Sequence, residues 1–137
     1  MADPFLDTDV VIRFVTGDNP EKQARAARLF EKVESGNLRV VMPLTVVADA
    51  VYVLNSARLY NRPRSEVANA LTLWVKSRNV RVSNRRTVLR ALELFGTMNL
   101  DFGDCVIIAS MEKARSDTVY SFDEDFDRIK GITRIEP

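Results

Sequence analysis

Four aspartates lie directly beside apolar runs of the sequence that we expect to be buried. They are Asp7, Asp49, Asp104 and Asp123. A carboxylate next to buried apolar surface is costly unless another group compensates its charge. If the four converge, each pair repels by roughly 4 kcal/mol at about 4 Å and an effective dielectric constant of about 20. Such a cluster requires either carboxyls kept protonated by raised pKa values or a divalent cation, and oxygen ligands suit Mg²⁺ or Mn²⁺.

Each acid also has a simpler structural explanation, because aspartate often begins helices. Asp7 and Asp123 could cap the helices that follow them, and Asp101 and Asp104 have the spacing of a capping box. Asp49 differs, because it lies inside a predicted helix, where aspartate is a poor helix former. For Asp7, Asp104 and Asp123 the residues alone leave both explanations open, whereas Asp49 has no such structural explanation and favours the shared site.

The residue types that are absent exclude several classes of site. The chain contains no histidine, which excludes histidine-based zinc sites, a Ser-His-Asp triad and a histidine general base. Cys105 is the single cysteine, so an internal disulfide is impossible, and its apolar neighbours predict a small core residue. There is no signal segment and no apolar stretch of transmembrane length. We therefore expect a soluble cytoplasmic protein that does not contact membranes.

Charge is distributed unevenly along the chain although the net charge is only +1. Residues 51–100 hold nine basic residues against two acidic ones, so the remainder is net acidic. An acidic site flanked by a basic stretch suits a polyanionic substrate that bridges to the site through metal. The alternative is that these arginines lie on solvated helix faces, as charge runs commonly do.

The length of 137 residues and a hydrophobic content of 46% fit one domain over residues 1–137. Strand signals occur at residues 5–7, 38–42, 80–82, 118–122 and 132–135, and helical patterns lie between them. This alternation predicts a mostly parallel sheet with helices on both faces. Sites in such sheets form at the carboxyl ends of strands, where Asp7 and Asp123 lie.

The helical segments are predicted from apolar stripes and capping residues. A short helix is expected at residues 9–15, and Pro20 is expected at the start of the next. Thr45 and Ser65 can cap two further helices, and Asn84 can start another. Residues 104–115 are apolar nearly all round, which predicts a buried helix.

Four blocks of the chain resemble, in order, the motifs of the PIN-domain family, and within it the VapC-type toxins of toxin–antitoxin pairs. The blocks are residues 5–13 (FLDTDVVIR), 43–54 (PLTVVADAVYVL), 101–109 (DFGDCVIIA) and 121–126 (SFDEDF). The resemblance extends from residue 5 to the C-terminus and therefore covers nearly the whole chain.

The resemblance implies an endoribonuclease dependent on Mg²⁺ or Mn²⁺, built as a three-layer α/β/α sandwich around a mostly parallel five-stranded sheet. It implies Asp7, Asp49, Asp104 and Asp123 as the catalytic, metal-binding acids. Secondary residues would be the hydroxyls of Thr8 and Ser121 and the acids Asp9, Asp101 and Asp125. A metal-bound water with a lowered pKa would attack the phosphorus in line, and the metal would stabilise the leaving oxygen.

The resemblance also implies partners: an RNA substrate, a cognate antitoxin and a second copy of the chain in a homodimer. Arginines that could border an RNA groove are Arg58, Arg62 and Arg64. Bulky side chains that one small core may not absorb, and that could pack against a second copy, are Tyr52, Tyr60, Leu73 and Trp74. For Tyr52 and Trp74 the alternative is an ordinary core position.

Two positions depart from the family pattern: Asp49 stands where a glutamate is usual, and Asp9 where an asparagine is usual. A PIN domain that binds RNA or protein without cutting is therefore an alternative. Asp7-Thr8-Asp9-Val10-Val11 also fits the opening string of haloacid-dehalogenase-type phosphatases, although the later second acid is missing. A phospho-receiver domain fails, because Asp49 lies in a predicted helix and not at a strand end.

Overall fold

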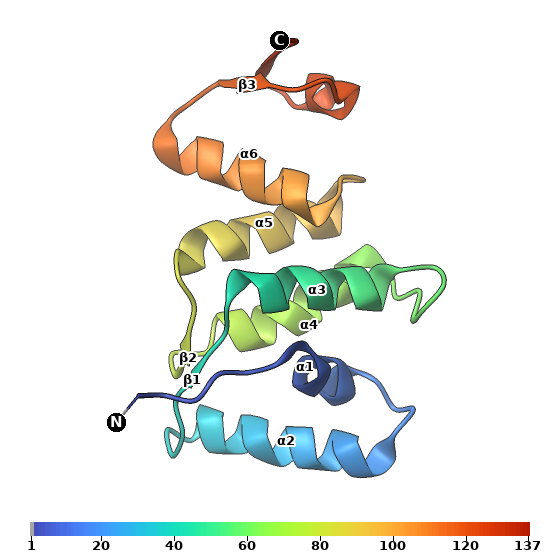
Figure 1. The fold of residues 1–137 in the computed structure, drawn as a ribbon, viewed down its shortest axis with the longest axis vertical. Helices are drawn as coiled ribbons and strands as arrows, with labels where there is room; N and C mark the ends of the chain where they lie inside the picture. The colour runs from blue at the N-terminus through green and yellow to red at the C-terminus, as the bar shows by residue number, and fades with distance from the viewer. Residues whose placement is uncertain (1) are drawn as a thin grey trace.

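The computed structural model describes residues 2–137 and has an α/β fold rich in helices (Figure 1). The elements, in chain order, are α1 (Thr8–Val15), α2 (Pro20–Glu34), β1 (Val40–Val41), α3 (Leu44–Asn55), α4 (Arg64–Val75), β2 (Val80–Arg81), α5 (Arg85–Thr97), α6 (Phe102–Ala114), β3 (Thr118–Tyr120), the 3-10 helix η1 (Glu124–Arg128) and β4 (Thr133–Ile135). In Figure 1 the helices are stacked from α2 at one end to α6 near the other, with β3 beyond α6.

An aromatic cluster fills the core between α1, α2 and α4. The ring centroid of Trp74 lies 5.2 Å from that of Phe14 and 4.7 Å from that of Phe30, both in edge-on geometry. Trp74 is fully buried, so the core alternative for this residue is confirmed. Cys105 is also fully buried, as its apolar neighbours predicted.

The α4–α5 contact is close enough to require a glycine. A Cβ atom built on Gly96 would lie 3.0 Å from the Cβ of Ala68, closer than side-chain carbons normally approach. Two small residues therefore let these helix backbones come together. This contact matters for the site, because α5 leads directly into the Leu100–Asp101 segment that begins α6.

The strands form two separate parallel pairs among residues 2–137. Val40 and Val41 of β1 pair with Val80 and Arg81 of β2. The N-terminal segment lies beside β1 through a single parallel bridge from Phe5 to Val41. The second pair joins β3 to β4 in parallel, from Thr118 with Thr133 to Tyr120 with Ile135.

Among residues 2–137 the strands do not join into one five-stranded sheet, so that strand count is not confirmed, although the expected parallel pairing is present. Each strand has only two or three residues, so pairing contributes few ladder hydrogen bonds. Burial of helix faces dominates instead, and α6 lies between the β1–β2 pair and β3 in Figure 1. Packing of α5 and α6 against the other helices keeps the C-terminal pair away from the N-terminal one.

Helices α3 and α4 each begin two residues earlier than the expected caps would place them. Pro43 and not Thr45 precedes α3, and Pro63 and not Ser65 precedes α4, in both cases without a side-chain cap. The fixed φ of proline suits this position, and its carbonyl accepts the first helical N–H groups. The Pro43 carbonyl accepts the N–H of Val46 at 3.0 Å, so the backbone replaces the hydroxyl cap.

Helix α6 is buried on one face and not all round. Its buried side chains include Phe102, Cys105 and Ile108, whereas Ile107 is 42% exposed. The prediction of a buried helix is thus correct for the face toward α5 and wrong for the opposite face. No helix of residues 2–137 is long and apolar enough to cross a membrane.

Candidate acidic site at the start of α6

Asp104, in the first turn of α6, lies among other acids. Burial of its carboxyl raises the pKa of Asp104, and the negative charges of Asp123, Asp101 and Asp125 raise it further. These acids come from the start of α6 and from the segment after β3, which are about twenty residues apart in the sequence. Tertiary packing therefore concentrates negative charge around one half-buried carboxyl.

The backbone before α6 is held by Arg64, the first residue of α4. Its Nε donates to the Phe95 carbonyl at 2.8 Å, and its Nη2 donates to the Leu100 carbonyl. The guanidinium carbon also lies 3.8 Å from the centroid of the Phe95 ring. Burial lowers the pKa of Arg64, and nearby Asp101 opposes that shift. Arg64 thus orients the segment that carries Asp101 and Asp104.

Asp123 is the N-cap residue of the 3-10 helix η1, and hydrogen bonds with residues close in the sequence orient it. Its Oδ1 accepts the N–H of Asp125 at 2.9 Å, so the capping explanation holds for this residue. Its backbone N–H donates to the Ser121 hydroxyl at 2.9 Å. Phe126, three residues later, is buried in the core and anchors this turn. The second oxygen of Asp123 has no such bond among the described residues.

Asp7 and Asp49 stand apart from this group. Asp7 is exposed and caps α1, its Oδ1 accepting the N–H of Thr8 at 2.7 Å. Asp49 lies on the exposed side of α3, next to buried Ala50. Neither is among the charges that shift the pKa of Asp104. Asp49 therefore has a structural explanation that its sequence pattern did not suggest: it faces solvent.

The four aspartates are not gathered into one metal-binding set in this structure. Within residues 2–137 no three or more histidine, cysteine, aspartate or glutamate side chains come close enough to hold a metal ion. The expected shared pocket is thus incomplete: Asp104 and Asp123 influence each other, whereas Asp7 and Asp49 do not join them. Their roles as metal ligands stay predictions.

The three arginines expected to border an RNA groove have different surroundings. Arg58 is exposed, and Arg62 lies 3.8 Å from a carboxylate oxygen of Glu66. Arg64 directs its guanidinium to backbone carbonyls, as described above, and its role as an RNA contact stays a prediction. A cavity of about 420 Å³ lies between the end of α3 and the start of α6, with Asp101 and Asn55 in its wall.

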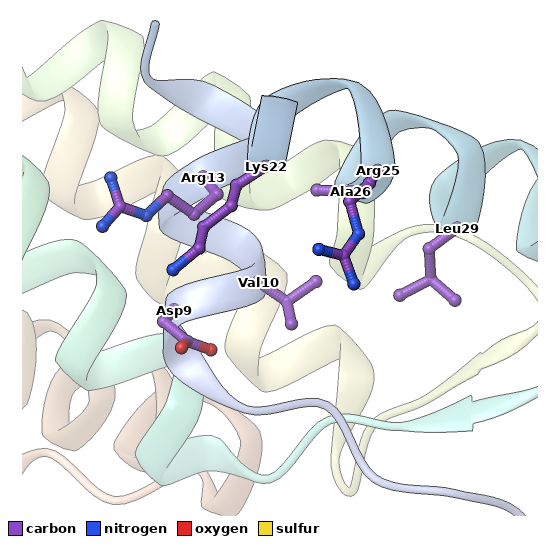
Figure 2. A pocket seen from close by; sticks show the side chains of 7 residues that line it. All are labelled: Asp9, Val10, Arg13, Lys22, Arg25, Ala26 and Leu29. Atoms are coloured by element: carbon purple, nitrogen blue, oxygen red, sulfur yellow. The ribbon is translucent and has the colours of Figure 1, made fainter. Parts of the chain in front are cut away.

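A second, basic cavity was missed by reasoning from the sequence. It lies between α1 and α2, and Arg13, Lys22 and Arg25 contribute its positive charge (Figure 2). The sequence feature that could have indicated this cavity is the spacing of three residues between Lys22 and Arg25, which places both cations on the same face of one predicted helix.

The sequence matches the PIN domain family over residues 5–132, and the chain therefore belongs to this family. Among solved structures it is similar to Mycobacterium tuberculosis VapC20, described as a toxin that cleaves the sarcin–ricin loop. The two share 21% identity over 98% of this chain and 100% of that chain, with a TM-score of 0.41. No curated protein matches the sequence. Family membership leaves the phosphatase interpretation of residues 7–11 without support.

Proposed function

We propose that this PIN-domain protein is a metal-dependent endoribonuclease that cleaves RNA phosphodiester bonds. The observation that carries the proposal is the acidic group around Asp104, whose pKa is raised by burial of its carboxyl and then by the charges of Asp123, Asp101 and Asp125. Negative charge concentrated in this way attracts a divalent cation, and a cation relieves the repulsion between the carboxylates.

The available donor atoms suit a hard cation. The chain has no histidine, and burial raises the pKa of the Cys105 thiol to about 11, so thiolate ligation is disfavoured. Carboxylate oxygens remain, and these suit Mg²⁺ or Mn²⁺. When bound, such an ion supplies an activated water and stabilises charge on the reacting phosphate.

The chain's own residues would orient the acids and the RNA. Asp104 and Asp123 would hold the cation, with Asp101 and Asp125 as secondary acids. The Ser121 hydroxyl, which accepts the Asp123 N–H, would keep that carboxylate in place. Arg64 would fix the backbone before α6 and so position Asp101 and Asp104.

Asp7 and Asp49 would complete the ligand set only with the cation present. Four carboxylates at close range repel by roughly 4 kcal/mol per pair at about 4 Å, and a bound cation would offset that repulsion. Thr8 and Asp9 would accompany Asp7 at the start of α1.

The test is cleavage of RNA by purified protein with Mg²⁺ or Mn²⁺, compared with variants of equal volume. Asp104→Asn and Asp7→Asn should each lower the cleavage rate by at least about 100-fold, because each removes a charged ligand. Asp117→Asn is the matched control, since Asp117 is exposed and outside the acidic group. Circular dichroism checks folding. Cleavage that persists with a chelator, or in Asp104→Asn, refutes the mechanism.

The second candidate is a PIN domain that binds RNA or protein without cutting it. The separation of Asp7 and Asp49 from Asp104 favours it, because fewer than three candidate ligands lie together in residues 2–137. Titration with Mn²⁺ separates the two functions. Metal-stimulated cleavage supports the nuclease, whereas RNA binding with no cleavage at any metal concentration supports the binding module.

We further propose that the protein acts as the toxin of a toxin–antitoxin pair and forms a homodimer. Exposed apolar side chains around the α3–α4 connection support a protein contact, since Tyr52 is 71% and Leu59 is 56% exposed. An antitoxin arginine could pair with the clustered carboxylates in place of metal, because a guanidinium matches carboxylates well. Co-purification with the product of a neighbouring reading frame tests the antitoxin.

A further inference from the structure

The cavity between α1 and α2 has a basic rim and an apolar floor (Figure 2). Its volume is about 330 Å³, which is in the range of small-ligand sites. Its walls are formed by Asp9, Val10 and Arg13 from α1 and by Lys22, Arg25, Ala26 and Leu29 from α2. A ligand that fits has negative charge on one side and an apolar part on the other.

The positive charge of the cavity is available for a ligand. Arg13 pairs with Asp18 at 3.1 Å, so its charge is largely compensated. Lys22 and Arg25 are exposed, and within residues 2–137 neither forms an ion pair. Figure 2 shows Lys22 extending from α2 across α1 in the direction of Asp9, and the Arg25 guanidinium beside α2.

The position of Lys22 strengthens the local positive potential. Asn19 caps α2 by accepting the N–H of Lys22 at 3.0 Å, so Lys22 lies in the first turn of the helix. A cation there adds to the positive end of the helix dipole, which is unfavourable for the helix alone. An anion held between Lys22 and Arg25 would benefit from both charges and from the dipole.

We propose that this cavity binds one phosphate of the RNA strand, with Lys22 and Arg25 pairing with its oxygens. The adjoining sugar or base would pack on Val10, Ala26 and Leu29. The proposal rests on the ribonuclease function above and extends it by naming a substrate subsite. Asp7 caps α1 and Asp9 follows two residues later, about 3 Å along the helix axis. A strand bound here would therefore pass directly beside Asp7.

The test compares two double variants that remove the same charges from the same helix. Lys22→Gln with Arg25→Gln removes the cavity cations. Arg28→Gln with Lys32→Gln removes one arginine and one lysine of α2 that are exposed and outside the cavity. Binding of a labelled single-stranded RNA oligonucleotide is measured in EDTA over a range of salt, and cleavage is measured with Mn²⁺.

We expect the cavity variant to bind RNA about tenfold more weakly than the control variant, as loss of one charged contact would give. Its plot of log affinity against log salt should be shallower by about 0.7 for each lost phosphate contact. In cleavage, KM should rise more than kcat falls. Exchanging the two residues (Lys22→Arg with Arg25→Lys) should retain binding, which excludes misfolding as the cause.

Equal RNA affinity of the two double variants, with cleavage by the wild-type chain intact, overturns the subsite and leaves the ribonuclease function standing. A wild-type chain that neither binds nor cleaves RNA overturns both. If the cavity variant binds RNA like the control but loses binding of a polyglutamate peptide, the cavity serves an acidic protein segment and the RNA proposal is wrong.

Discussion

Arg64 is a positioning residue: it holds the backbone segment that carries Asp101 and Asp104 of the candidate acidic site. Its guanidinium bonds to the carbonyls of Phe95 and Leu100, at the end of α5 and just before α6. A planar guanidinium reaches two carbonyls and stacks on a ring at once, which an ammonium group does not do. The charge of this residue suggested an RNA contact, and its position at the start of α4 lets the guanidinium reach these backbone carbonyls.

Arg64→Lys should therefore destabilise the protein although it keeps the charge. We expect a loss of about 2 kcal/mol in the free energy of unfolding, because hydrogen bonds from a charged group to carbonyls are lost. Urea denaturation measures this change. Arg58→Lys, at an exposed position, should change stability by less than about 0.5 kcal/mol. An unchanged urea midpoint in Arg64→Lys would show that these contacts contribute nothing.

At the scale of elements, the C-terminal segment is tied together by Arg134 of β4. Its Nε and Nη2 donate to the two carboxylate oxygens of Asp127 at 3.0 and 3.1 Å, and its Nη1 donates to the Ser121 carbonyl. These bonds join β4, η1 and the end of β3. The strands have three residues each, so side-chain bonds supplement a short ladder.

The Arg134 contacts lower the pKa of Asp127 below its ordinary value of 3.8. A lowered folded-state pKa means that this contact stabilises the fold above about pH 3.8 and is lost as the pH falls through the lower folded value. Hydrogen-exchange protection of residues 118–135 should accordingly fall in acid. Asp127→Asn should reduce that protection already at neutral pH.

Glu124→Gln is the control for this segment, because Glu124 is an exposed acid of the same 3-10 helix. Its exchange should match the wild-type protein at neutral pH. Protection that is the same in Asp127→Asn and in the wild-type protein would contradict the role of this ion pair.

At the scale of the whole molecule, several large apolar side chains remain exposed. They include Tyr52, Leu59, Leu73, Tyr120 and Phe122. Trp74 is absent from this set because it completes the aromatic core, so the surface around the α3–α4 connection depends on Tyr52 and Leu59. This surface is the one we assign to the homodimer.

Light scattering at micromolar concentration should detect a dimer of the wild-type chain, and Tyr52→Ser should shift it toward the monomer. Burial of a tyrosine at an interface contributes about 1–3 kcal/mol, a shift of roughly tenfold or more in the dissociation constant. Tyr120→Ser is the control, because Tyr120 is 71% exposed, as is Tyr52, but belongs to β3 and not to the α3–α4 region. A monomeric wild-type chain, or equal dissociation in both variants, would contradict this interface.

Local patterns in the sequence determined the helices and the acidic candidates. The apolar stripe and the proline of α2 predicted that this helix begins at Pro20. The short acceptor side chain of Asp7 predicted a helix cap, and Asp7 caps α1. The order of motifs from residue 5 onward predicted the family, which the match over residues 5–132 confirms. These features depend on neighbours within a few residues, so sequence spacing is sufficient to recognise them.

Only the tertiary structure decided which of these residues meet. The charge of Asp123 raises the pKa of Asp104 although the two residues are about twenty positions apart in the sequence, whereas Asp49 faces solvent on α3. The interior role of Arg64 and the basic cavity between α1 and α2 also arise between segments that are separate in the sequence. Burial, charge proximity and strand pairing depend on how whole helices pack, and spacing along the chain does not encode that packing.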